Sequence, residues 1–248
     1  MIEAVNLHKS FDRNPVLDGV DLRIDTGESA VIIGRSGGGK SVLLKHLIGL
    51  LLPDSGVVRV DGEDLAAMDE RKLLQVRRKF GMVFQGSALF DSMTVAENVG
   101  FLLQREGLFK PAEIGQRVAE ALAMVDLSGT EDKKPAELSG GMRKRVGLAR
   151  SIVYQPQILL YDEPTTGLDP VVADSIDRLI LRVSEQLKVT SIAVTHDMRT
   201  ARRIGRRILM LHEGRIYANG TPDEIFNSND PVVQRFVQGV SDPKEALF

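Results

Sequence analysis

Short apolar runs alternate with amphipathic stretches along most of this chain. Polar and apolar positions alternate in Val16–Ile24, which is typical of a half-exposed antiparallel strand. Continuous apolar runs, typical of strands buried on both faces, occur at Ser29–Ile33, Ile158–Tyr161 and Thr190–Val194. Shorter runs predict further strands at Ile2–Leu7, Val57–Val60, Phe80–Phe84, Ile208–Leu211 and Arg215–Tyr217.

Helical spacing of apolar residues dominates the middle of the chain, where no good strand pattern occurs. The predicted helices are Lys40–Leu50, Val95–Arg105, Pro111–Val125, Gly140–Tyr154, Val171–Leu187, one that begins after Thr221, and Asp230–Gly239. Two strand–helix blocks around a helical insert imply an α/β core with an N-terminal antiparallel β portion and an inserted α-helical subdomain. We expect the core at 1–90 and 156–229, the helical subdomain at 91–155 and a tail at 230–248.

The predicted tail helix has an apolar stripe that must be covered, because an isolated helix of about ten residues is marginal in water. The stripe comprises Val232, Val233, Phe236, Val237 and Val240. Two alternatives stay open: the stripe packs on the chain's own core, or it packs on a second subunit or a small regulatory partner.

Composition narrows the function classes. The 248 residues include 32 basic and 34 acidic ones, so the net charge of −2 argues against a chain held on nucleic acid by bulk charge. The absence of Cys excludes a disulfide scaffold and a Cys nucleophile. No apolar run approaches the ~18 residues that span a bilayer. We therefore expect a cytosolic location and a membrane role only through a partner.

A glycine-rich segment predicts a phosphate-binding loop. It matches G-x4-G-K-[ST] and lies between a buried strand and a helix, the context that the motif requires. Successive backbone N–H groups and the start of the helix can hold phosphate oxygens. The side chain of Lys40 can reach the β- and γ-phosphates, and the hydroxyl of Ser41 can bind Mg²⁺. The loop consists of Gly34, Arg35, Ser36, Gly37, Gly38, Gly39, Lys40 and Ser41.

Two acidic residues follow the buried strand Ile158–Tyr161. Asp162 can hold Mg²⁺ beside the glycine-rich loop, through water. Glu163 can polarise the water that attacks a metal-bound triphosphate. Acidic strand ends are common, so this pair gains its meaning from the phosphate loop upstream.

A second phosphate-seeking helix start is predicted at Ser139, Gly140 and Gly141, just upstream of Asp162. Ser139 is a natural helix cap, and the two glycines permit close approach of an anion. Because the chain already has one complete phosphate loop, a second such helix start suggests a site shared between two subunits.

These motifs together give the chain, over nearly its full length, a resemblance to the ATPase subunit of ABC transporters. Leu138–Gly141 resembles the family's signature sequence. The resemblance implies a P-loop NTPase (ABC ATPase) core, ATP and Mg²⁺ as cofactors, and ATP bound between two copies of the subunit. It also implies roles for residues elsewhere. Gln85 would sense Mg²⁺ and couple to a transmembrane permease, Asp169 would lie in the loop that crosses the dimer, and His196 would contact the γ-phosphate. Phe11 and Val16 would bind the nucleotide, Phe11 by stacking on adenine.

Some details depart from the commonest family pattern. Val42 stands where Thr is usual, Met142 where Gln or Glu is usual, and Phe11 where Tyr is commoner. Segments 39–46, 88–95 and 138–145, which include Val42 and Met142, resemble the Mla-type, MCE-associated branch of lipid transporters. That branch implies phospholipid cargo, a location at the cytoplasmic face of the inner membrane, and two further partners, a small regulatory subunit and an MCE-type lipid-binding protein.

Other functions stay open at this point. The cargo could be an amino acid, a metal or a lipoprotein, because the ATPase subunit does not touch it. A soluble ABC ATPase that acts on ribosomes or DNA is a further alternative, although such proteins usually carry two cassettes or a long coiled coil. The basic stretches at 77–79 and 202–207 are interpreted as solvated helix faces, or as contacts for an acidic partner helix or lipid headgroups.

Overall fold

The computed structural model describes residues 1–241, and the chain divides into two units. The first unit contains residues 1–69 and the segment that starts at Val194, and the second contains Glu70–Ala193. Part of the predicted tail, residues 242–248, lies outside the described residues.

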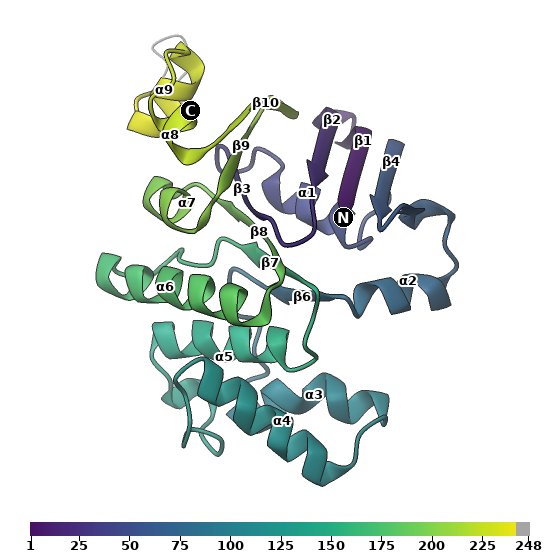
Figure 1. Cartoon of the computed structure of the whole chain (residues 1–248), viewed down its shortest axis with the longest axis vertical. Helices are drawn as coiled ribbons and strands as arrows, with labels where there is room; N and C mark the ends of the chain where they lie inside the picture. The colour runs from purple at the N-terminus through teal and green to yellow at the C-terminus, as the bar shows by residue number, and fades with distance from the viewer. Residues whose placement is uncertain (242–248) are drawn as a thin grey trace. The chain divides into compact units, whose positions relative to one another are not determined.

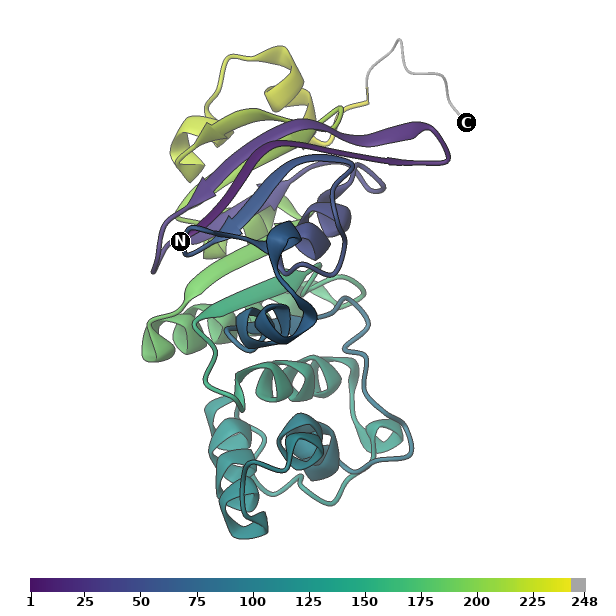
Figure 2. The same ribbon diagram turned by 90° about the vertical axis from the view of Figure 1, so that its right-hand side faces the viewer.

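An antiparallel sheet occupies the N-terminal part of the first unit, in the order β2-β1-β4-β5 (Figure 1). Its strands are β1 (Ile2–Phe11), β2 (Asn14–Ile24), β4 (Ser55–Val60) and β5 (Glu63–Asp64). The β1–β2 hairpin is longer than predicted, because pairing continues past the apolar residues to Phe11 opposite Asn14. Figure 2 shows the length of this hairpin in the purple ribbon.

The remaining strands of the first unit hold the glycine-rich loop. Strand β3 (Ser29–Ile33) is parallel to β9 (Arg207–His212), and β10 (Arg215–Gly220) forms a hairpin with β9. Helix α1 (Lys40–Leu47) follows β3 through the glycine-rich loop. These predicted elements are confirmed, with α1 ending three residues early. A 3-10 turn, η1 (Leu65–Ala67), follows β5.

Three short helices complete the first unit: α7 (Met198–Ile204), α8 (Pro222–Phe226) and α9 (Pro231–Gln238). The tail helix α9 packs partly on its own unit, since Val233 is only 1% exposed and the side chain of Gln234 donates to the carbonyl of Phe226. The rest of its stripe is half-buried, and Val240 is 56% exposed. Its own core therefore covers one edge of the stripe.

Parallel strands also form the centre of the second unit. Strand β6 (Phe80–Val83) pairs with β7 (Ile158–Asp162), and β8 (Thr190–Thr195), whose last two residues belong to the first unit, follows on the other side of β7. The surrounding helices are α2 (Glu70–Arg77), α3 (Val95–Glu106), α4 (Pro111–Met124), α5 (Gly140–Ile152) and α6 (Pro170–Leu187), with a 3-10 turn η2 (Pro135–Glu137). Between β6 and β7 the described chain is helical, as the sequence predicts.

Close packing at two glycines fixes the helices α3, α4 and α5. A Cβ at Gly100 of α3 would lie 3.2 Å from Val118 of α4, so the two helices pack tightly at that point. A Cβ at Gly81 of β6 would overlap the carbonyl oxygen of Ser151, so the end of α5 lies directly against β6. Among the described residues, no helix combines the length and the apolar character needed to cross a membrane.

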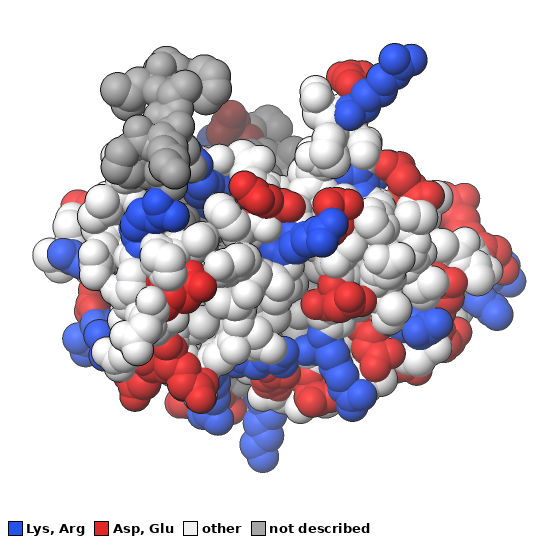
Figure 3. All heavy atoms as spheres, turned by 90° about the horizontal axis from the view of Figure 1, so that it is seen from above, with Lys and Arg blue, Asp and Glu red and all other residues white. Residues whose placement is uncertain are grey.

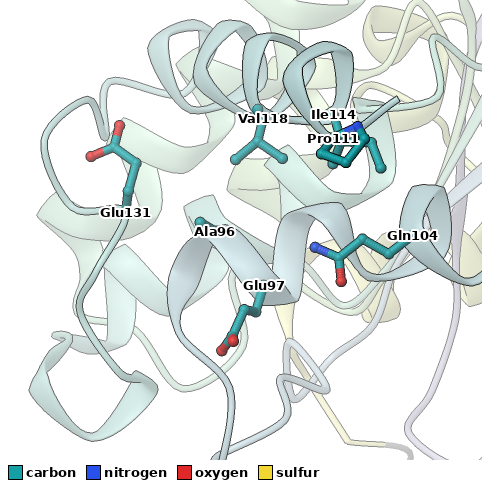
Figure 4. A pocket seen from close by; sticks show the side chains of 8 residues that line it. Ala96, Glu97, Gln104, Pro111, Ile114, Val118 and Glu131 are labelled. Atoms are coloured by element: carbon teal, nitrogen blue, oxygen red, sulfur yellow. The ribbon is translucent and has the colours of Figure 1, made fainter. Parts of the chain in front are cut away.

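A pocket of about 470 Å³ opens between α3 and α4 (Figure 4). Its lining combines apolar and polar side chains: Ala96, Glu97, Gln104, Pro111, Ile114, Gly115, Val118 and Glu131. Glu97 is already engaged in the capping box at the start of α3, where its carboxylate accepts from the N–H of Thr94 at 2.7 Å.

Candidate functional site

The glycine-rich loop has the backbone conformation that a phosphate cradle requires. Gly37 and Gly39 have φ values of 76° and 93°, in the left-handed region that favours glycine. Gly34 has a different reason to lack a side chain, because a Cβ there would lie 2.5 Å from the carbonyl oxygen of Leu211 in β9. The strand pair β3–β9 therefore sets where the loop begins, and the left-handed glycines curl it.

Lys40 lies across this loop. Its side chain is 5% exposed, and its ammonium donates to the carbonyls of Gly34 at 2.8 Å and Arg35 at 3.0 Å. The N-cap residue of α1 is Gly39, which has no side chain to make a capping hydrogen bond. A helix start of this kind with a lysine beside it fits an anion, and the Ser41 hydroxyl supplies an oxygen of the kind that Mg²⁺ prefers.

Val16 and Phe11 lie on the β1–β2 hairpin of the same unit. A Cβ at Gly39 would lie 2.9 Å from the carbonyl oxygen of Val16, so β2 contacts the glycine-rich loop directly. Phe11 is 43% exposed at the end of β1, and the ammonium of Lys9 lies 5.5 Å from its ring centroid. The structure thus brings Val16 to the loop and leaves Phe11 partly exposed.

His196 follows β8 in an exposed position of the first unit. The backbone on either side of it is held in place. Asp197 caps α7 by accepting from the N–H of Arg199 at 2.7 Å, and its own N–H donates to the hydroxyl of Thr195 at 3.0 Å. An imidazole on a fixed turn can meet an anionic ligand without reordering of the chain.

In the second unit, Asp162 and Glu163 lie at the carboxyl end of β7, where the sequence places them. They are 9% and 8% exposed, so both are nearly buried. Glu163 has a φ of 49°, an uncommon conformation for a residue with a side chain. The hydroxyl of Thr166 donates to a carboxylate oxygen of Glu163 at 3.1 Å. This hydrogen bond orients the carboxylate that we predict to act as a base.

Gln85 and Glu163 follow neighbouring parallel strands, since Val83 pairs with Tyr161. The carbonyls of Gln85 and Glu163 both accept from the ammonium of Lys144 on α5. Sequence reasoning missed this role of Lys144, although the spacing of Lys144, Gly147 and Arg150 places them on one face of the predicted helix.

The signature segment begins α5 as predicted. The hydroxyl of Ser139 accepts from the N–H of Met142 at 3.2 Å, which confirms its capping role. A Cβ at Gly140 would make an ordinary contact, 3.4 Å from Leu168, but one at Gly141 would lie only 2.7 Å from Val172 of α6. Packing within the chain is therefore one reason for the second glycine.

Asp169 lies in the segment against which these glycines pack. Its carboxylate accepts from the N–H groups of Val171 and Val172, each at 3.0 Å, and so caps α6. Asp169 is exposed. The structure gives this residue a capping role in its own chain, beside the role that the resemblance implies.

The chain's own acidic groups engage several of the basic residues. Arg78 pairs with Glu106 at 3.1 Å, and Arg207 pairs with Glu28 at 3.0 Å. Arg202 lies over the ring of Phe226, 5.1 Å from its centroid. Basic and acidic side chains are interspersed over the face seen in Figure 3. These observations favour the solvated-face interpretation of the basic stretches.

Comparisons with known proteins are consistent with this geometry. The family model "ABC transporter" matches residues 17–166. The probable ribonucleotide transport ATP-binding protein mkl of Mycobacterium tuberculosis is 42% identical over 238 residues, which are 96% of this chain and 66% of that protein, so this chain spans slightly less than two thirds of its length.

The protein TRIGALACTOSYLDIACYLGLYCEROL 3, chloroplastic, of Arabidopsis thaliana is 41% identical over 98% of this chain and 74% of its own length. Among solved structures, the dimeric ATP-binding cassette MJ0796 in a post-hydrolysis state with ADP and Pi has a TM-score of 0.81 and 33% identity, over 90% of this chain and 99% of that one. Proteins named for methionine import and for sulfate or thiosulfate import also match, at 40% and 43% identity.

Proposed function

Because this chain belongs to the ABC transporter family, we propose that it is the subunit that binds and hydrolyses ATP to drive lipid transport through a transmembrane permease. Members of this family hydrolyse ATP, which they bind with Mg²⁺, and the predicted ABC ATPase fold is confirmed. The observation that carries the proposal is the left-handed glycine loop that leads into α1, with the side chain of Lys40 across it.

Each predicted residue has a chemical role in this proposal. The N–H groups of Gly34–Ser41 and the ammonium of Lys40 bind the phosphates, and Phe11 and Val16 bind the adenine end. Oxygens of Ser41, Gln85 and Asp162 would hold Mg²⁺, which would neutralise phosphate charge. Glu163 takes the proton of the attacking water, and His196 contacts the γ-phosphate. These residue roles are proposed from the sequence motifs and from the roles of matching residues in the family.

We further propose that two copies enclose the nucleotides. Ser139, Gly140, Gly141 and Asp169 of one copy would then face the glycine-rich loop of the other. The dimeric state of the solved cassette supports this arrangement. Binding from both faces closes the dimer, and loss of the γ-phosphate lets it reopen, which is how the subunit would move its permease.

Lipid is the cargo that we favour. The support is the Mla-type pattern, with Val42 and Met142, and the relative whose printed name refers to a galactolipid. In this proposal the chain lies at the cytoplasmic face of the inner membrane, held there by the permease, and the complex includes an MCE-type lipid-binding protein and a small regulatory subunit. Mass spectrometry of molecules that co-purify with the native complex tests the cargo. Recovery of phospholipid supports it, and recovery of methionine, sulfate or ribonucleotides instead overturns it.

Glu163→Gln tests the proposed chemistry. The amide keeps the size and polarity of the side chain but cannot take a proton, so we expect ATP binding to survive while turnover falls ~10²–10⁴-fold. Light scattering after size-exclusion chromatography should then show an ATP-trapped dimer. Glu185→Gln, on an exposed position of α6, is the matched control and should behave as wild type. Near-normal turnover of Glu163→Gln would contradict the assignment.

A further inference from the structure

One face of α5 runs along the segment 85–88 that follows β6. The ammonium of Lys144 donates to the carbonyl of Gln85, and the guanidinium of Arg150 donates to the carbonyls of Ser87 and Ala88, both at 2.7 Å. Between the two cations lies Gly147, where a Cβ would lie 3.5 Å from Ser87, an ordinary contact. Lys144 and Arg150, six residues apart on one face of α5, thus hold the helix against this loop.

The loop itself has an unfavourable backbone. Ser87 and Ala88 have φ values of 60° and 46°, and neither is glycine. The left-handed conformation is unfavourable for a residue with a side chain, and it persists only where surrounding groups impose it. Ser87 is 3% exposed, and its N–H donates to the carbonyl of Phe84 at 2.9 Å. The donors on α5 add hydrogen bonds to the carbonyls of this segment and so help to hold its conformation.

Lys144 also reaches a second loop. Its ammonium lies 3.5 Å from the carbonyl oxygen of Glu163, which has a φ of 49°. The lysine is 7% exposed. Burial lowers its pKa, and the carboxylates of Glu163 and Asp162 oppose that shift. Burying a cation is costly unless it is hydrogen-bonded, and here the two main-chain carbonyls accept from it.

We propose that Lys144 is a positioning residue for ATP hydrolysis, which fixes the main chain at Gln85 and at Glu163 together from the helix that begins with the signature segment. This inference rests on the proposed function, because it assigns those two side chains to the reaction. Lys144 touches no reacting atom in this mechanism. Its effect is to keep the two loops in register with each other, so that the Gln85 amide and the Glu163 carboxylate are held at a constant separation.

Steady-state kinetics of the purified full-length chain test the proposal with three variants. Lys144→Met keeps length and removes the donors, Lys144→Arg keeps charged donors that can meet two carbonyls, and Lys133→Met removes an exposed lysine of the same unit. For Lys144→Met we expect kcat to fall ~10–100-fold, with KM for ATP within about twofold of wild type, the result for a group that positions rather than binds. Lys144→Arg should recover most of kcat, and Lys133→Met should match wild type.

Hydrogen exchange gives a readout that does not depend on turnover. The peptide spanning residues 84–89 should exchange faster in Lys144→Met than in wild type and Lys144→Arg, because one of its restraining hydrogen bonds is gone. Unchanged exchange overturns the proposal, as does a lower kcat that tracks a lower melting temperature and is not recovered by Lys144→Arg. Glu163→Gln measured alongside separates the two ideas. If that variant loses turnover while Lys144→Met does not, the proposed function stands and this inference fails, whereas normal turnover of Glu163→Gln counts against the proposed function.

Discussion

Replacing the second signature glycine tests whether packing inside the chain requires it. The added Cβ of Gly141→Ala would lie 2.7 Å from a methyl of Val172, well inside the ~3.5–4.0 Å of favourable carbon contacts. Val172 has little freedom to yield, because Asp169 holds its N–H and a β-branched residue in a helix has one preferred rotamer. Overpacking of this kind costs about 1–3 kcal/mol, and alanine regains at most about 1 kcal/mol of helix propensity. We expect a net loss of about 1 kcal/mol in the free energy of unfolding.

Urea unfolding of a double-mutant cycle measures this effect. Val172→Ala removes the methyl in question, so Gly141→Ala should cost less in that background, with a coupling of about 1 kcal/mol. Gly140→Ala is the matched control, because its Cβ would lie 3.4 Å from Leu168 and should leave stability unchanged or raised. Effects of Gly141→Ala and Val172→Ala that add within about 0.5 kcal/mol would refute the packing argument. If Gly140→Ala then weakens the ATP-trapped dimer without loss of stability, that glycine acts on the nucleotide.

Two further predictions concern stability. Gly115→Ala in α4 should raise the free energy of unfolding by up to about 1 kcal/mol, because its Cβ would enter the open pocket between α3 and α4 and meet nothing within 4 Å. Gly81→Ala should destabilise the chain by more than about 2 kcal/mol, because its Cβ would overlap the carbonyl of Ser151. Thermal unfolding that ranks the two variants the other way would contradict this reasoning. Burial lowers the pKa of His46 below its usual value of about 6.5, so the unfolded chain binds the proton more readily than the folded one. The free energy of unfolding should therefore fall as the pH drops from about 6.5 toward the lowered pKa. His46→Gln should remove this part of the pH dependence, and identical stability–pH profiles for the variant and wild type would contradict the argument.

The strongest periodicities predicted their elements well. The buried runs at β3, β7 and β8 and the helices α3 to α6 were found within one or two residues at each end. Helix α2 was missed because Val76 is its only buried residue, so its pattern has no apolar face to detect. For α7 the sequence indicates only a solvated helix face at 202–207 and no helix bounds, because the helix is seven residues long and begins directly after the loop of His196. Short elements depend on tertiary packing that a local pattern does not encode.

The residues of the candidate site likewise differ in how well the sequence predicts them. The loop Gly34–Ser41 and the pair Asp162 and Glu163 are contiguous motifs, so the sequence reveals them. The role of Lys144 was not predicted, because its partners are main-chain carbonyls, which every residue carries and no residue type marks. The left-handed backbone at Ser87 and Ala88 was equally hidden, since neither residue type favours it. Hydrogen bonds to the backbone are visible only once the chain is folded.

The close approach of α5 to β6 gives the second unit a lever. Because Gly81 leaves no space beside Ser151, the C-terminal end of α5 cannot slide toward the strand and can serve as a pivot. The helix has 13 residues and is therefore about 20 Å long. A tilt of roughly 10° about that pivot would displace Ser139, at the far end, by about 3 Å, which is enough to break a hydrogen bond made there. A partner that pushes on the segment 85–88, midway along this arm, would thus produce a larger movement at the signature segment than the one it applies.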